Sequence, residues 1–234
     1  VLAAVLASGM VLTACGGSGN GAKETTGNQA STTTTTTTGG LDLAVQIGPD
    51  PETVDPALNT AIDASNVILH AFETLLTFDE NNDIVPGQAE SFDVSDDGLT
   101  YTFHLRDGLK WSDGSDFTAE DFVYSWKRLA DPMTAAPYAA DMLSMVKGYD
   151  EAAAGDIDAL GVSASDAKTL VVELSSPCVY FDKIITHASM APVKKDVVDA
   201  NGDQWALAPE TYISNGPLKM IEWVPGSHIT FAKN

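Results

Sequence analysis

The residue types that most often carry catalysis or bind metals are sparse in this chain and follow no catalytic spacing. The four histidines show neither a metal-ligand spacing nor an HExxH pattern, and no serine lies in a GxSxG elbow; they are His70, His104, His187 and His228. His70 and Glu73 share one face of an expected helix, but a single HxxE pair does not define a site. We therefore expect that the protein is not an enzyme and holds no metal and no cofactor.

Cys15 is the residue whose surroundings point most clearly to a covalent modification. It ends Leu12-Thr13-Ala14-Cys15, and residues 1–14 form an apolar run too short to span about 30 Å of hydrocarbon. An aliphatic residue, two small residues and a Cys resemble the bacterial lipobox, in which the sulfur receives diacylglycerol. We expect residues 1–14 to be a signal peptide that begins inside its reading frame, and Cys15 to be a lipidated membrane anchor. The alternative, a buried or disulfide-bonded Cys15, is disfavoured by the Gly- and Ser-rich sequence that follows.

The second cysteine, Cys178, has no partner for an intrachain disulfide once Cys15 is lipidated. We expect Cys178 to be a small buried apolar side chain. The stability of the fold then has to come from an ordinary apolar core.

Residues 15–40 have the composition of a linker. They consist largely of Gly, Ser, Asn, Ala and Thr, with an uninterrupted threonine run from Thr32 to Thr38. A polythreonine strand is the alternative, but seven identical polar side chains offer no apolar face to bury. We expect a flexible tether because burial cannot offset the entropy of ordering it.

The charge and composition narrow the class of partner. Acidic side chains number 33 and basic ones 12, which gives a formal net charge of -21. Such a surface repels phosphate backbones, so nucleic-acid binding is disfavoured. With 44% hydrophobic and 8% aromatic residues, the chain has enough apolar surface to fold. We expect a globular domain, monomeric, on a tether.

Two segments early in the folded part have clear periodicity. Apolar residues alternate with others from Leu41 to Ile47, which predicts a half-buried strand. After an irregular stretch, Asp63 or Ser65 is expected to cap a helix. The expected apolar face of that helix carries Val67, Ile68, Ala71, Phe72, Leu75 and Leu76.

Later segments predict a mixture of strands and helices. Alternation over Leu99 to Leu105 predicts a strand, and Thr118 to Asp121 resembles a capping box that opens a helix ending at Asp131-Pro132. Phe122, Val123, Trp126 and Leu129 are expected to face inward, and Lys127 and Arg128 to complement the helix dipole. Further strands are expected at 169–174, 218–223 and 228–231, with a short helix near Val179. The predicted class is α/β with mixed sheets.

Several motifs together closely resemble the family 5 extracellular solute-binding proteins, which include oligopeptide and dipeptide receptors. The resemblance rests on residues 89–92, 97–114 and 118–126, and extends to Thr53-Val54-Asp55-Pro56, Asp131-Pro132, Ser176-Pro177, Asn215-Gly216-Pro217 and Glu222-Trp223. It covers essentially all of residues 41–234. Much of it has a structural explanation, since Asp113-Gly114 makes a turn and Trp111 and Trp126 can fill a core.

The resemblance implies a periplasmic-binding-protein-like fold of class II, cluster C type, with two lobes that close as a clamshell. The first lobe would comprise residues 41–73 and 191–234, with an inserted subdomain at 74–190. The chain stops after an expected strand, so we expect only the first lobe and its insertion to be present.

The resemblance also implies a function and a set of ligand contacts. It implies an extracytoplasmic receptor, on the outer face of the cytoplasmic membrane or in the periplasm, that delivers peptides to the permease subunits of an ABC transporter. Asn59, Thr60, Ala61 and Ile62 match positions whose backbone pairs with an extended peptide, and Tyr138 matches a tyrosine near the ligand's N-terminal end. An ordinary buried tyrosine is the alternative for Tyr138. The alternative functions are a relative that binds nickel, haem or a sugar, and a secreted lipoprotein hydrolase.

Overall fold

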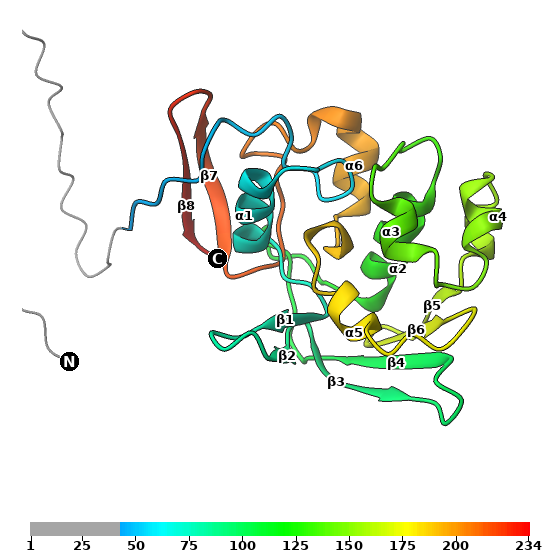
Figure 1. Cartoon of the computed structure of the whole chain (residues 1–234). Coiled ribbons are helices and arrows are strands. Elements are labelled where there is room, and N and C mark those ends of the chain that lie inside the picture. The colour runs from blue at the N-terminus through cyan, green and yellow to red at the C-terminus, as the bar shows by residue number, and fades with distance from the viewer. Residues whose placement is uncertain (1–42) are drawn as a thin grey trace, which may run out of the picture. The chain divides into compact units, whose positions relative to one another are not determined.

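Helices and strands are interspersed without a strict repeat in the computed structural model, which describes residues 43–234 (Figure 1). The helices are α1 (Ile62–Ala71), α2 (Ala119–Ala130), α3 (Ala139–Leu143), α4 (Tyr149–Ala153), η1 (Ile157–Ala159), α5 (Phe181–Ile184), η2 (Ala188–Met190), α6 (Lys195–Asn201) and η3 (Gly202–Gln204). The strands are β1 (Leu76–Phe78), β2 (Ile84–Pro86), β3 (Ala89–Val94), β4 (Thr100–Leu105), β5 (Val162–Asp166), β6 (Thr169–Glu173), β7 (Leu218–Val224) and β8 (His228–Lys233). The predicted Cys15 and the linker of residues 15–40 lie outside the described residues.

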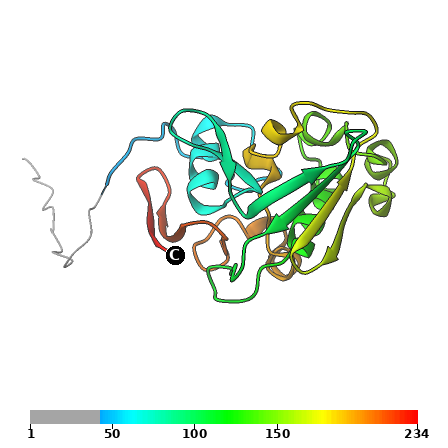
Figure 2. The same ribbon diagram turned by 90° about the horizontal axis from the view of Figure 1, so that it is seen from below.

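A four-stranded antiparallel sheet in the order β3-β4-β6-β5 organises the middle of the chain (Figure 2). In β4 the side chains alternate, so that Tyr101, Phe103 and Leu105 are buried while their neighbours are half-buried. This is the pattern of a strand with one covered face, and it confirms the strand predicted at 99–105. The strand predicted at 169–174 is likewise confirmed as β6.

Helix α2 packs against β5 and β6 and supplies much of the core beneath the sheet. Its start is fixed because the Asp121 carboxylate accepts a hydrogen bond of 2.8 Å from the Thr118 backbone N–H. Phe122 and Trp126 are fully buried, and the Trp126 indole donates to the Met190 carbonyl at 3.1 Å. The helix stops before Asp131, so its predicted cap, buried face and end are confirmed.

Helix α1 differs from its prediction at both ends. It begins at Ile62, so Asp63 lies within the first turn and neither Asp63 nor Ser65 is the capping residue. The predicted apolar residues are all buried, but Phe72 leaves the helix in an extended conformation. The reason is tertiary: Asn215 hydrogen-bonds both the N–H and the carbonyl of Glu73, which holds the chain extended after Ala71.

The strand predicted from Leu41 to Ile47 is wrong over its described part. Residues 43–47 form no strand, and the side chains of Leu43 and Val45 are exposed. None of the strands in residues 43–234 pairs with this segment. Residues 43–47 alternate in sequence, but they have neither the neighbouring strand nor the covered face that would stabilise them as a β-strand.

The hairpin of β7 and β8 confirms the two strands predicted near the end of the chain. Gly226 forms its turn with a φ of 73°, and the Gly226 N–H donates to the Asp50 carboxylate at 2.9 Å. Helix α1 lies against β7 (Figure 1). The short helix expected near Val179 begins at Phe181 as α5, and Val179 itself is exposed.

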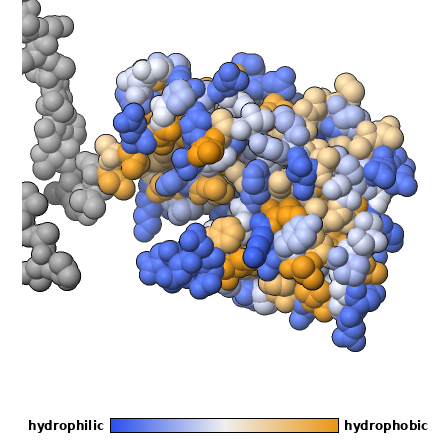
Figure 3. Space-filling model, in the orientation of Figure 1, coloured by the Kyte–Doolittle hydropathy of each residue, from blue (hydrophilic) through white to orange (hydrophobic). Residues whose placement is uncertain are grey.

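The surface of residues 43–234 mixes polar and apolar side chains, and the face in Figure 3 shows apolar patches separated by hydrophilic ones. Among these residues, no helix has the length and apolar character needed to cross a membrane.

Candidate functional site

The predicted ligand segment is a short stretch of exposed chain held from beneath by one buried side chain. Asn59 is only 2% exposed, whereas Thr60, Ala61 and Ile62 are exposed. The Asn59 amide oxygen accepts from the Ala61 N–H at 2.8 Å, and its amide nitrogen donates to the Ser65 hydroxyl at 2.8 Å. The Asn59 side chain thus shapes the segment internally, and the three residues after it face outward.

The backbone groups of this segment are not all available to a ligand. Ala61 uses both of its groups, since its N–H donates to Asn59 and its carbonyl accepts from the Ser65 N–H at 3.0 Å. Within the described residues, the N–H and C=O of Thr60 and the N–H of Ile62 make no hydrogen bond. Exposed extended backbone with free donors and acceptors is what a peptide needs in order to add as a strand.

Asp55 fixes the approach to this segment through a buried cluster that the sequence analysis missed. The Asp55 carboxylate is 2% exposed and accepts from Arg128 at 3.0 and 2.6 Å, the Trp205 indole at 3.0 Å and the Ala57 N–H at 2.9 Å. Its carbonyl accepts from the Asn59 N–H at 3.0 Å. The carboxylate therefore connects α2 and the segment after η3 to the loop that leads into Asn59.

Arg128 has a different role from the one predicted, because it pairs with Asp55 rather than only complementing the dipole of α2. Burial acts to lower the pKa of Arg128, but the hydrogen bonds and the charge of Asp55 outweigh it, so the pKa is raised. The guanidinium is fully charged, and the pair is a bidentate charge-assisted contact. The sequence shows Asp55 only as part of an Asp-Pro pair in an apolar stretch. Nothing in that pair predicts that the carboxylate binds an arginine 73 residues later.

Tyr138 lies at the start of α3 and is half-buried. Its ring meets the His187 ring in an edge-to-face contact, with centroids 5.6 Å apart and planes at 75°. His187 directly precedes η2, which contacts both α1 and α2. The turn at η2 therefore lies between the surroundings of Tyr138 and helix α1, which begins at Ile62.

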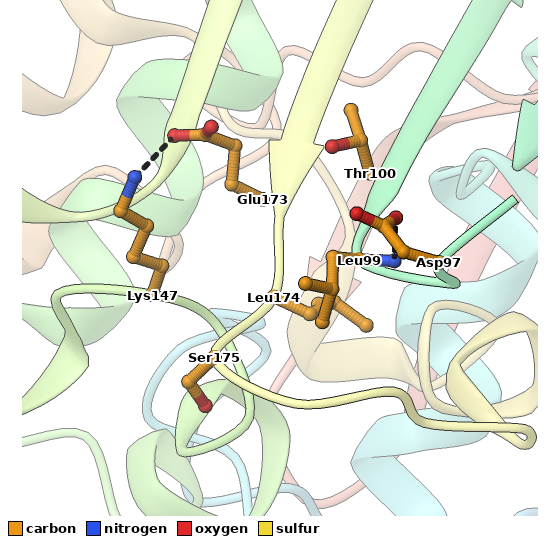
Figure 4. Close-up of a pocket in the computed structure, with 7 residues that line it drawn as sticks. All are labelled: Asp97, Leu99, Thr100, Lys147, Glu173, Leu174 and Ser175. Carbon is orange, nitrogen blue, oxygen red and sulfur yellow. Dashed lines mark hydrogen bonds and ion pairs between the residues drawn. The ribbon is translucent and has the colours of Figure 1, made fainter. Parts of the chain in front are cut away.

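A hollow of about 510 Å³ lies elsewhere, at the ends of β4 and β6 (Figure 4). Its lining is about equally polar and apolar, and the side chains of Lys147 and Glu173 point toward each other across 3.2 Å. Ligand pockets are usually more enclosed and more apolar. The hollow includes none of the predicted ligand residues; it is lined by Asp97, Leu99, Thr100, Lys147, Glu173, Leu174 and Ser175.

A family model described as "Bacterial extracellular solute-binding proteins, family 5 Middle" matches residues 83–234. The chain belongs to this family. The predicted family is thereby confirmed, and its members are binding proteins that act outside the cytoplasm.

Two curated relatives show how much of a family member is present. The chain is 41% identical over 190 residues to the periplasmic oligopeptide-binding protein OppA of Salmonella typhimurium. It is 38% identical over 188 residues to the probable deoxycholate-binding periplasmic protein YgiS of Escherichia coli. The alignments cover 80% and 79% of this chain but 35% of each relative, so the chain spans about a third of their length.

Solved structures of the family support the fold. Haemophilus influenzae OppA, in complex with the peptide RPPGFSPFR, superposes with a TM-score of 0.76 at 38% identity, covering 80% of this chain and 37% of that one. The substrate-binding domain of an oligopeptide ABC transporter from Bacillus anthracis gives a TM-score of 0.77 at 35% identity, covering 80% and 36%. These likenesses confirm the predicted α/β fold of the periplasmic-binding-protein type.

Proposed function

We propose that the chain is part of an extracytoplasmic receptor that binds oligopeptides and delivers them to the permease of an ABC importer. The observation that supports this most directly is the exposed segment Thr60 to Ile62, whose free backbone groups are held in place by Asn59 and Asp55. The family membership and the relatives that bind oligopeptides give this segment its context.

In this proposal the peptide adds to the segment as an extended strand. The Thr60 and Ile62 backbone groups pair with the peptide backbone, and Tyr138 packs near the ligand's N-terminal end. Main-chain hydrogen bonds are common to all peptides, so this mode suits a receptor of broad specificity. The first lobe would comprise residues 41–73 and 191–234, with the insertion at 74–190, and closure against a second lobe would present the loaded receptor to the permease. The receptor acts by binding and carries out no reaction.

A proline at position 62 tests strand addition with little disturbance of the fold. Ile62 is the first residue of α1, where proline is well tolerated, and Ala61 has φ −111° and ψ 145°, which suits a residue before proline. The Ile62 side chain is 82% exposed, so its loss removes little packing. We expect Ile62→Pro to weaken peptide binding by about 1–3 kcal/mol, or roughly 5- to 150-fold, because a peptide carbonyl loses its donor.

The matched control is Ile62→Val, which keeps the N–H and should bind as the unaltered protein does. Affinities are measured by calorimetric titration with a tetrapeptide mixture, on protein expressed from its complete reading frame, with circular dichroism to show that the fold is intact. Undiminished binding by a folded Ile62→Pro protein would eliminate strand addition at this segment. Deoxycholate is titrated in parallel because one relative is named for binding it. Binding of deoxycholate, nickel, haem or a sugar in place of peptides would favour the alternative of another ligand in the same family.

The membrane anchor is a separate part of the proposal and rests on the sequence at Cys15, which lies outside the described residues. With its own signal peptide, Cys15→Ser is expected to move the protein from the detergent phase to the aqueous phase in a Triton X-114 partition, because the acyl chains are lost. Cys178→Ser is the control and should leave partitioning unchanged, since Cys178 is buried in the fold. Retention of the Cys15→Ser protein in the detergent phase would refute lipidation at this residue.

A further inference from the structure

The Ser65 hydroxyl lies at the centre of a small hydrogen-bond network behind the ligand segment. It accepts from the Asn59 amide nitrogen at 2.8 Å and donates to the Ala61 carbonyl at 3.0 Å. The oxygen of the same Asn59 amide accepts from the Ala61 N–H at 2.8 Å. Two side chains, one before the segment and one after it in the sequence, therefore take up both backbone groups of Ala61.

The contact of the Ser65 hydroxyl with Asn59 distinguishes it from an ordinary helical serine. A serine in a helix often hydrogen-bonds the carbonyl four residues earlier, and that contact alone would have no special meaning. The Ala61 carbonyl already accepts from the Ser65 N–H at 3.0 Å. Asn59 is only 2% exposed, and its amide nitrogen makes no other hydrogen bond among residues 43–234. Without the hydroxyl, this buried donor would have to turn away to find a partner.

The bonds to Ala61 determine where the backbone groups of its neighbours point, because each peptide unit is planar. The peptide bonds of the segment are trans, so the N–H and the C=O of one unit point in opposite directions. The Ala61 N–H points to Asn59, so the Thr60 carbonyl points away from it. The Ala61 carbonyl points to Ser65, so the Ile62 N–H points away from that side chain. These two free groups thus have fixed directions before any ligand binds.

The segment has the arrangement of a sheet edge in which two side chains replace the inner strand. Ala61 is extended, with φ −111° and ψ 145°. In an extended chain, the backbone groups of one residue point to one side and those of its neighbours point to the other. The inner side is occupied by Asn59 and Ser65, whereas the outer side, at Thr60 and Ile62, makes no hydrogen bond within the described residues.

We propose that Ser65 is a positioning residue for peptide binding. By anchoring the Asn59 amide, it holds the Thr60 carbonyl and the Ile62 N–H in the directions that an added peptide strand requires. This inference rests on the proposed peptide-binding function, and in this role Ser65 does not touch the ligand. A segment that is ordered in advance loses less conformational entropy when the ligand binds. The loss of the hydroxyl should therefore weaken the binding of peptides of every sequence alike.

Three variants of helix α1 measure the contribution of the hydroxyl. Ser65→Ala removes it, and Ser65→Thr restores it. Asn66→Ala is the matched control, because it truncates an exposed neighbouring side chain that makes no hydrogen bond among residues 43–234. We expect Ser65→Ala to bind the tetrapeptide mixture roughly five- to tenfold more weakly, and the other two to bind within about twofold of the unaltered protein. Calorimetric titration gives the affinities, and circular dichroism gives the thermal midpoints.

A double-mutant cycle with Asn59→Ala shows whether Ser65 acts through the Asn59 amide. If it does, Ser65→Ala should cost affinity in the unaltered background and almost none where Asn59 is already alanine. Equal losses of affinity in both backgrounds would overturn the inference. A Ser65→Ala protein that loses thermal stability but binds peptides normally would also overturn it, because the hydroxyl would then only stabilise the fold.

Amide hydrogen exchange tests the same inference on the unaltered protein, so this measurement does not depend on the folding of a variant. Before peptide is added, the Ala61 N–H should exchange slowly, and the Thr60 and Ile62 N–H groups should exchange quickly. Equal exchange at all three positions would show that the segment is not ordered in advance, contrary to the inference.

The results also separate this inference from the proposed function. Weakened binding by Ile62→Pro, together with normal binding by Ser65→Ala, overturns the role of Ser65 and leaves strand addition in place. Failure of the unaltered protein to bind any peptide overturns both.

Discussion

Replacing Arg128 by Met is expected to lower the free energy of unfolding by about 3–5 kcal/mol, because the Asp55 carboxylate would remain buried without its cation. Asp55 is 2% exposed and Arg128 12% exposed, so water cannot take the place of the guanidinium. Met fills a similar volume, which confines the change to the lost charge and its two hydrogen bonds. The measurement is urea denaturation followed by tryptophan fluorescence.

The matched control is Lys127→Met, one position earlier on the same helix. Lys127 pairs with Asp158, whose side chain is 84% exposed, so water can solvate the carboxylate when the lysine is removed. We expect this control to change stability little. A loss for Arg128→Met no larger than that of the control would mean that Trp205 and Ala57 alone satisfy Asp55, and that the ion pair has no structural importance.

Gly148→Ala is expected to lower the free energy of unfolding by about 3–5 kcal/mol. Gly148 precedes α4 with a φ of 75°, where a side chain is strained. A Cβ would also lie 1.9 Å from the Ala159 carbonyl oxygen at the end of η1, far inside any tolerable contact. Backbone cannot rotate away as a side chain can, so α4 and η1 would have to separate.

Gly108→Ala isolates the strain from the collision. Gly108 has nearly the same φ, 74°, but nothing lies within 4 Å of the Cβ it would gain. It should therefore cost roughly 1–2 kcal/mol, the price of the left-handed conformation alone. The two unfolding free energies are compared in the same denaturant. Equal losses would show that η1 moves aside freely and that its contact with Gly148 does not restrain the fold.

The parts of the fold that could be predicted from the sequence are those whose causes are local. The alternation through Tyr101 and Phe103 is a property of neighbouring residues, and so is the reciprocal arrangement of Thr118 and Asp121 at the start of α2. Periodicity also identified Val67, Ile68 and Ala71 as buried residues of α1, but it missed Ala64. It did not show where α1 ends, because Asn215 determines the conformation after Ala71 from the far end of the chain.

The strand predicted at 41–47 shows that a regular alternation in sequence is not enough to form a strand. Its alternation is as regular as that of β4, but a strand exists only where a second strand supplies hydrogen bonds. Val45 and its neighbours have no such partner within residues 43–234. The local pattern therefore shows that the segment has the alternation of a strand, but it does not show whether a strand forms in the folded protein.

The candidate site was predictable only in outline. Asn59 to Ile62 and Tyr138 came from the family resemblance, which names positions but does not say which groups are already in use. The structure adds that both backbone groups of Ala61 are hydrogen-bonded within the protein, whereas the Ile62 N–H makes no hydrogen bond among residues 43–234. The ion pair of Arg128 with Asp55 was not predicted because it joins residues that are 73 positions apart in the sequence.

The hydrogen-bond donors to the Asp55 carboxylate affect the order in which parts of the protein fold. Arg128 follows Asp55 by 73 residues and Trp205 follows it by 150, so the contacts that hold the loop at Asp55 depend on residues far downstream. Contacts with such long sequence separation close large loops and tend to form late in folding. Because synthesis runs from the N-terminus, the loop leading to Asn59 is made before Arg128 and Trp205, and it becomes rigid only after they are present. A nascent chain that has not yet reached Trp205 would carry the ligand segment without the indole hydrogen bond that helps to hold Asp55 beneath it.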